Sequence, residues 1–139
     1  MSYRPDCIVD TCIWIAEQRA PSQFELYAPY LAGKIIGVSF QTYAELITKP
    51  KDLQKYKRKF YEEGLATVLS PDEETCRLWA TLVNTWIVNK RPKPYPAQDF
   101  WQAATALRYK VPLVTHNRKH FEDIPKLEVV SHVPEKRAG

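Results

Sequence analysis

Three acidic residues, Asp10, Glu45 and Asp99, occupy positions where a carboxylate is costly. Asp10 directly follows the apolar run 7–9, and Asp99 precedes a helix-forming stretch rich in alanine and aromatic residues. Glu45 has apolar neighbours in another helix-forming stretch, so we expect it to be partly buried. A buried carboxylate needs a partner, a helix N-terminus to cap, or a bound cation. These three side chains are therefore the first candidates for a functional site.

The chemistry of such a site follows from its ligand atoms. Converging carboxylates cannot all stay ionised in a dry cleft without a cation between them. Ligands that are all oxygen, with no Cys or His nearby, favour Mg²⁺ or Mn²⁺ over zinc. Mg²⁺ keeps several waters and completes its shell with substrate phosphate, so the coherent reaction is phosphodiester hydrolysis by metal-activated water.

Each acid also has a structural explanation when it is considered alone. Asp10 can cap the helix that follows it, and Asp99 can complement the dipole of its helix from the first turn. Glu45 can be an ordinary surface residue of a helix. The functional interpretation therefore depends on whether the fold brings the three side chains together.

Short apolar runs alternate with stretches of helical periodicity along the chain. We expect strands at 7–9, 34–38, 66–69, 113–114 and 127–130. We expect helices at 11–16, 21–31, 40–49, 51–63, 71–87 and 98–109. The segment 91–96 is predicted to be a surface loop, because its prolines fix the backbone and remove hydrogen-bond donors.

The clearest predicted helix start precedes the stretch 71–87. Ser70 is the expected N-cap, Pro71 the first helical residue and Glu73 the capping-box acid. The apolar residues of this helix recur at helical spacing and are expected to be buried: Cys76, Trp79, Leu82, Val83, Trp86 and Ile87.

The order of these elements predicts an α/β fold, a three-layer α/β/α sandwich with a mostly parallel central sheet. Ligands of such sheets bind at the carboxyl ends of the strands. Asp10 follows the first strand, Glu45 lies in the helix after the second strand, and Asp99 lies at the start of the helix after the proline loop. They can therefore converge at one edge of the sheet.

Composition sets the broad class of the protein. The chain has 139 residues and is 45% hydrophobic, which suits one domain, expected at 1–133, with a disordered tail at 134–139. No membrane-spanning run or signal sequence is recognisable, so a cytoplasmic protein is expected. The three cysteines lack zinc-site spacing and are interpreted as reduced, mostly buried thiols. The formal net charge of +4 favours a polyanionic partner.

Four blocks of the sequence, in family order, resemble PIN domains, and the resemblance is nearest to VapC-type toxin ribonucleases of type II toxin–antitoxin modules. The blocks are residues 8–14, 43–46, 99–107 and 112–121. The resemblance implies a PIN-like nuclease in which Asp10, Glu45 and Asp99 bind Mg²⁺ or Mn²⁺ and Thr11 and Thr115 support the site. It further implies products with a 5′-phosphate and a 3′-hydroxyl, a homodimer, and a cognate antitoxin whose C-terminal segment occupies the active groove.

The last block departs from the family pattern at Asn117. Family members often have a fourth acid there or a few residues on, where this chain has Lys119 and His120. Asn117 can hydrogen-bond metal-bound water, but a neutral side chain lowers the negative charge of the site. We therefore expect one protein-bound ion, with any second ion arriving with the substrate.

Single-stranded or looped RNA is the favoured substrate class, because such sites combine a basic groove with aromatic side chains for stacking. Arg118 and Lys119 are the better candidates for phosphate contacts. His116 and His120 can contact the phosphate or protonate the leaving oxygen, although a histidine in a turn is more often merely solvated. Aromatic candidates, for each of which core or loop packing is the better explanation, are Trp14, Tyr43, Tyr95 and Trp101.

Three other functions compete with a ribonuclease. The missing fourth acid favours a non-catalytic PIN-like module that binds RNA or protein. A structure-specific DNA nuclease would need extra elements for which this chain is too short. A Rossmann-like nucleotide binder is disfavoured by the small number of glycines, four, and by the lack of a phosphate-binding loop motif.

Overall fold

The computed structural model describes residues 4–134, and its centre is a sheet of five parallel strands. The strand order is β3-β2-β1-β4-β5. The strands are β1 (Cys7–Val9), β2 (Ile36–Ser39), β3 (Thr67–Leu69), β4 (Leu113–Val114) and β5 (Val129–Val130). The predicted α/β class is confirmed, and the sheet is parallel throughout rather than mostly so.

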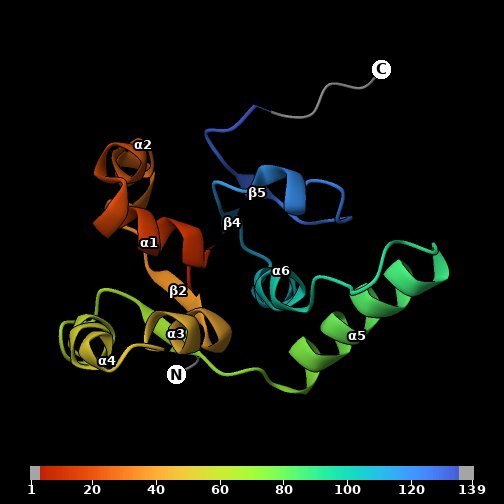
Figure 1. The fold of residues 1–139 in the computed structure, drawn as a ribbon, viewed down its shortest axis with the longest axis horizontal. Coiled ribbons are helices and arrows are strands. Elements are labelled where there is room, and N and C mark those ends of the chain that lie inside the picture. The colour runs from red at the N-terminus through yellow and green to blue at the C-terminus, as the bar shows by residue number, and fades with distance from the viewer. Residues whose placement is uncertain (1–3, 135–139) are drawn as a thin grey trace.

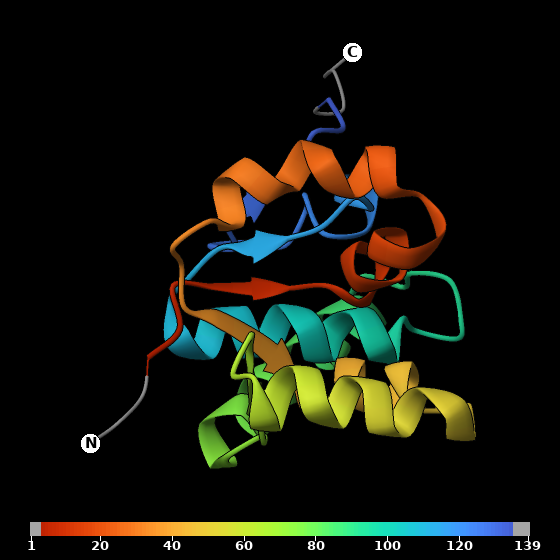
Figure 2. The same ribbon diagram turned by 90° about the vertical axis from the view of Figure 1, so that its left-hand side faces the viewer.

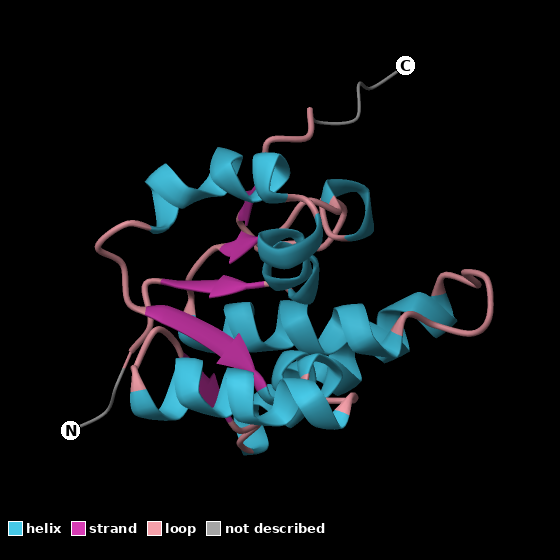
Figure 3. Cartoon of the chain, turned by 60° about the vertical axis from the view of Figure 1, so that its left-hand side comes forward, coloured by secondary structure: helices cyan, strands magenta, loops and turns pink. Residues whose placement is uncertain are grey.

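The helices form two layers around this sheet (Figure 1, Figure 3). They are α1 (Thr11–Arg19), α2 (Pro21–Leu31), α3 (Phe40–Leu46), α4 (Pro50–Lys57), α5 (Glu73–Val88) and α6 (Ala97–Tyr109). A π-helical turn, Arg58–Glu62, extends α4, and a short 3₁₀ helix, Arg118–His120, follows β4. Figure 2 shows α1 and α2 on the other side of β1 from α6.

Alternation along β1 divides the core between the two layers. Cys7 and Val9 point to a cluster with Trp14 of α1 and Tyr27 of α2. Ile8 points to the opposite cluster, which contains Ala103 and Ala106 of α6. Strands buried on both faces in this way are typical of parallel sheets. The carboxyl end of β1 therefore lies between the two helical layers, in the middle of the sheet edge.

Several predicted helix bounds are wrong, most clearly at α5. The helix begins at Glu73, and Asp72 rather than Ser70 is its N-cap. The Asp72 carboxylate accepts hydrogen bonds from the backbone N–H of Thr75, at 2.9 Å, and from its hydroxyl, at 2.8 Å. Two donors to one charged acceptor outweigh the single bond that the Ser70 hydroxyl can offer.

Other bounds shift by a few residues. α1 continues to Arg19, α3 stops at Leu46, and the stretch predicted as one helix at 51–63 divides into α4 and the π-helical turn. β2 and β5 begin two residues later than predicted. These ends depend on sheet pairing and packing, which local pattern does not record.

The predicted burial of α5 and of the cysteines is also wrong in part. α5 packs mainly against α6, so Cys76 and Ile87 are exposed, and the other apolar residues of its predicted stripe are half-buried. Cys7 is buried and Cys12 is half-buried. Within residues 4–134 no helix is long and apolar enough to cross a membrane. Almost all of the predicted tail, residues 135–139, lies outside the described residues.

Candidate active site

Asp10 leaves the carboxyl end of β1 and caps α1, with its side chain 5% exposed. Its Oδ1 accepts the backbone N–H of Thr11 at 2.8 Å. Its Oδ2 accepts the hydroxyl of Thr115 at 2.7 Å. A carboxylate offers about four lone-pair positions, so these two bonds leave acceptor capacity for a cation. Asp10 therefore caps α1 and can bind a cation at the same time.

Cys12 completes the surroundings of Asp10. Its Sγ lies 3.4 Å from Asp10 Oδ2 and 3.5 Å from Thr115 Oγ1, and it accepts the backbone N–H of His116 at 3.4 Å. Burial, reinforced by the charge of Asp10, raises the pKa of the Cys12 thiol to about 12. Cys12 is therefore a neutral thiol that can donate to Asp10, not a nucleophile.

Asp10, Glu45, Asp99 and Asn117 line one cleft of about 210 Å³ at the carboxyl edge of the sheet. The predicted acids are thus brought together from the end of β1, from α3 and from α6. Glu45 is half-buried, as expected from its apolar neighbours, and the side chain of Asp99 is 30% exposed.

Burial raises the pKa of all three carboxyl groups. The charges of Asp10 and Asp99 raise the pKa of Glu45 further, and the charge of Asp10 does the same for Asp99. Such mutual repulsion shows that the three groups share one electrostatic environment. A cation in the cleft would relieve it.

Asp99 has a cationic neighbour of its own in His120. Asp99 Oδ2 lies 3.3 Å from Nδ1 of His120, an ion pair when the imidazole is protonated. Within residues 4–134, no three acidic, His or Cys side chains form a ready-made metal cage. The all-oxygen donor set and its mutual repulsion nevertheless fit a hard divalent cation.

A buried polar network below the cleft joins α1, α3 and α6. Thr42 accepts hydrogen bonds from Thr11 Oγ1, at 2.9 Å, and from Gln102 Nε2, at 2.5 Å. Ser39, the N-cap of α3, donates to Gln102 Oε1 at 3.1 Å. The four residues are at most 7% exposed. The network fixes the helix that carries Glu45 against the helix that carries Asp99.

The predicted substrate-binding residues lie in a hollow next to the cleft, and Asn117 lines both. His116, Arg118 and Lys119 line only that hollow. His116 Nδ1 is 2.7 Å from the hydroxyl of the buried Tyr27, and Arg118 donates to the backbone carbonyls of Ser131 and Val133. Lys119 is exposed.

Sequence reasoning missed Cys12 and Gln102 as parts of this site. Gln102 follows Asp99 by three residues, so it lies on the same face of α6, and it is the polar residue of the apolar run 100–104. That exception was a usable signal. Cys12 offered none, because a buried thiol is usually a small apolar group.

The raised pKa of Glu45 makes a prediction about the metal-free protein. When the pKa of a carboxyl group is higher in the folded than in the unfolded protein, ionising the group destabilises the fold. The free energy of unfolding is therefore unaffected by Glu45 below about pH 4, and it decreases as the pH rises through the folded-state pKa. Glu45→Gln removes the repulsion with Asp10 and Asp99. We expect it to raise Tm by about 2–5 °C at about pH 7, and to have no such effect near pH 4. Thermal unfolding in EDTA measures this.

Glu25→Gln, at an exposed position of α2, is the matched control. It removes the same charge away from the cleft and should leave Tm unchanged. Equal Tm for Glu45→Gln and wild type at neutral pH would show that the acids do not repel one another.

Comparison with known proteins agrees with this geometry. Residues 7–127 match the PIN domain family. The chain is similar to Ribonuclease VapC1 of Haemophilus influenzae, with 32% identity over 120 residues, covering 84% of this chain and 88% of the relative. It is also similar to Ribonuclease VapC of Rickettsia bellii, with 30% identity over 128 residues, covering 89% of this chain and 94% of the relative.

A solved structure shows the same likeness in three dimensions. VapBC-1 from nontypeable Haemophilus influenzae superposes with a TM-score of 0.69 and 27% identity. The match covers 90% of this chain and 96% of that chain. Sequence and fold thus point to one family.

Proposed function

Because the chain belongs to the PIN-domain family, we propose that it is a metal-dependent endoribonuclease of the VapC kind, the toxin of a type II toxin–antitoxin pair. The observation that carries the proposal is the cleft in which Asp10, Glu45 and Asp99 meet, each with a raised pKa. Together with Asn117 they place four oxygen-bearing side chains at the carboxyl edge of a parallel sheet, an arrangement that suits hydrolysis of a phosphodiester.

Asp10, Glu45 and Asp99 would hold the ion. When bound, Mg²⁺ or Mn²⁺ supplies positive charge for the phosphate and activates water. Thr115 and the N–H of Thr11 hold the Asp10 carboxylate in one orientation, so its oxygens need not reorganise on binding. Asn117 contributes a neutral amide at the rim of the cleft. We infer one tightly held ion, and a calorimetric titration without RNA should give one site.

The remaining predicted contacts belong to the same proposal. We infer that Lys119 meets substrate phosphate, and its exposure next to Asn117 supports this. The guanidinium of Arg118 holds the chain at Ser131 and Val133, so we assign it to shaping the rim. His120, which faces Asp99, is the better histidine for a proton near the scissile bond.

Partners follow from the relatives. The similar structure from Haemophilus influenzae is described as VapBC-1. By that likeness we propose a cognate antitoxin for this chain. We also propose a homodimer, and a single nuclease domain formed by residues 1–133.

The proposal predicts that the purified protein cleaves RNA from a mixed cellular pool in Mg²⁺ or Mn²⁺ and not in EDTA. Loss of the ion removes water activation and restores repulsion among the acids, so the rate should fall by a factor of about 10³ or more. Gel analysis gives the rate, and end-group labelling should identify 5′-phosphate and 3′-hydroxyl termini.

Cleavage that persists in EDTA, or products with 2′,3′-cyclic phosphates, would contradict a metal-activated water. Freshly purified protein that binds RNA or a protein partner, but cleaves none of a broad set of RNAs, would favour the non-catalytic module instead.

A further inference from the structure

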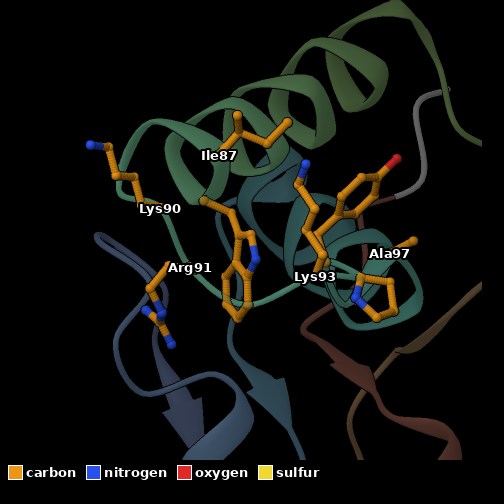
Figure 4. A pocket seen from close by; sticks show the side chains of 8 residues that line it. Ile87, Lys90, Arg91, Lys93 and Ala97 are labelled. Carbon is orange, nitrogen blue, oxygen red and sulfur yellow. The ribbon is translucent and has the colours of Figure 1, made fainter.

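A second cavity, of about 1040 Å³, lies where α5 ends and the loop 89–96 begins. In Figure 1, α5 lies outside α6, and this loop joins the two helices. Figure 4 shows the cavity from close by. The lining residues that matter here are Trp86, Lys90, Arg91, Lys93, Tyr95 and Ala97. The mechanism above uses none of them.

The charge of this cavity is entirely positive. Lys90, Arg91 and Lys93 line it, and no acidic residue does. Among the residues that the structure describes, none of the three has a carboxylate within salt-bridge distance. Cations without counterions at a concave surface attract phosphate.

An aromatic platform lies beside these cations. The indole Nε1 of Trp86 donates to the carbonyl of Pro92 at 2.7 Å, and its ring meets Phe100 edge-on at 5.7 Å. The Arg91 guanidinium lies over the Trp86 ring, 4.2 Å from its centroid. A guanidinium placed over a ring can also stack on a nucleobase, and single-stranded RNA is recognised by such planar groups.

The cavity adjoins the acidic cleft along the chain. Ala97, the first residue of α6, lines the cavity, and Gln98 lines the cleft. The Cα atoms of these consecutive residues are about 3.8 Å apart. Asp99 follows immediately. A strand that lies across the start of α6 can therefore occupy the cleft and the cavity together.

We propose that this cavity binds a nucleotide of single-stranded RNA that flanks the scissile phosphodiester, with its phosphates on the three cations and its base on the Arg91–Trp86 stack. The inference rests on the proposed function, because it treats the RNA in the cleft as the same strand. It makes affinity depend on RNA length: short RNA fills the cleft, and longer RNA also fills the cavity.

The test compares wild type with Lys90→Gln/Arg91→Gln/Lys93→Gln. Fluorescence anisotropy measures Kd for labelled oligouridylates of about 4 and about 16 nucleotides, in Ca²⁺, a hard cation that also takes oxygen ligands, with gels confirming that the RNA stays uncut. The variant should bind the long RNA about tenfold more weakly and the short RNA unchanged. The slope of log Kd against log salt should fall by about 2, because each phosphate neutralised on single-stranded RNA contributes about 0.7 to it.

The matched control is Lys34→Gln/Lys110→Gln/Lys126→Gln. It removes the same charge from residues that precede β2, β4 and β5, at the opposite edge of the sheet. Its length dependence should equal that of wild type. A cavity variant that binds the long RNA as tightly as this control overturns the proposal. So does a cavity variant that changes only the oligomeric state, because the cavity is then an interface between copies of the chain.

A separate cleavage assay distinguishes failure of this proposal from failure of the proposed function. If the wild type cleaves RNA and the cavity variant has unchanged affinity, the flanking site is refuted and the proposed nuclease activity stands. If the wild type cleaves no RNA but the cavity variant binds the long RNA more weakly, the proposed nuclease activity is refuted and the RNA-binding cavity stands.

Discussion

Asp99→Asn is expected to lower kcat for RNA cleavage by a factor of about 10³ or more, which corresponds to about 4 kcal/mol of transition-state stabilisation. The substitution keeps the size of the side chain and removes one of the three charges proposed to hold the ion. Because Pro96 rather than Asp99 is the N-cap of α6, the fold should be retained. Single-turnover cleavage at saturating metal measures the effect.

The control is Asp123→Asn, an exposed acid in the hollow beyond Asn117. It removes the same charge near the cleft without changing the ligands of the ion, so kcat should stay within about twofold of wild type. Asp10→Asn should behave as Asp99→Asn does. If Asp99→Asn kept more than about a tenth of wild-type kcat with normal metal dependence, the three-acid centre would be refuted.

The second large effect is expected at Gln102. Gln102→Ala removes the bond to Thr42 and the acceptor for Ser39, both inside the protein. Ser39 and Thr42 keep their bond to each other, at 3.2 Å, but the two lost bonds and the new cavity should together cost about 3 kcal/mol, or about 10 °C in Tm. Because only packing such as the Phe40–Trp101 ring contact then holds α3 against α6, kcat should also fall, by about tenfold, with little change in KM.

Gln98→Ala is the matched control, since Gln98 lies on the same helix and in the same cleft but is exposed. It should lose little stability. Gln102→Glu retains an acceptor for Ser39 and should recover part of the lost kcat. Loss of stability at Gln102→Ala with kcat unchanged would leave the network a structural role only.

Much of this architecture could be predicted from short-range pattern. The apolar run before Asp10 predicted β1, and the alternation of strands with helices predicted a sandwich whose carboxyl edge holds the acids. That edge is where Asp10, Glu45 and Asp99 meet. The prediction worked because the position of a strand end follows from local apolarity and topology together.

What could not be predicted depends on contacts between distant segments. Ser70 and Asp72 both suit an N-cap, and the choice followed from the bonds to Thr75 and from the pairing of Asp72 with Arg108, 2.8 Å away. Arg118 looked like a phosphate ligand, but its guanidinium reaches Ser131 and Val133. No local pattern records such partners.

The bond between Asp10 and the N–H of Thr11 has an evolutionary consequence. Asparagine caps a helix about as well as aspartate, and the Thr115 hydroxyl can turn to accept from an amide. A single codon change that replaces Asp10 by asparagine can therefore abolish the proposed activity while the fold is retained. The resulting protein would be folded and inactive, and it should still bind the proposed antitoxin.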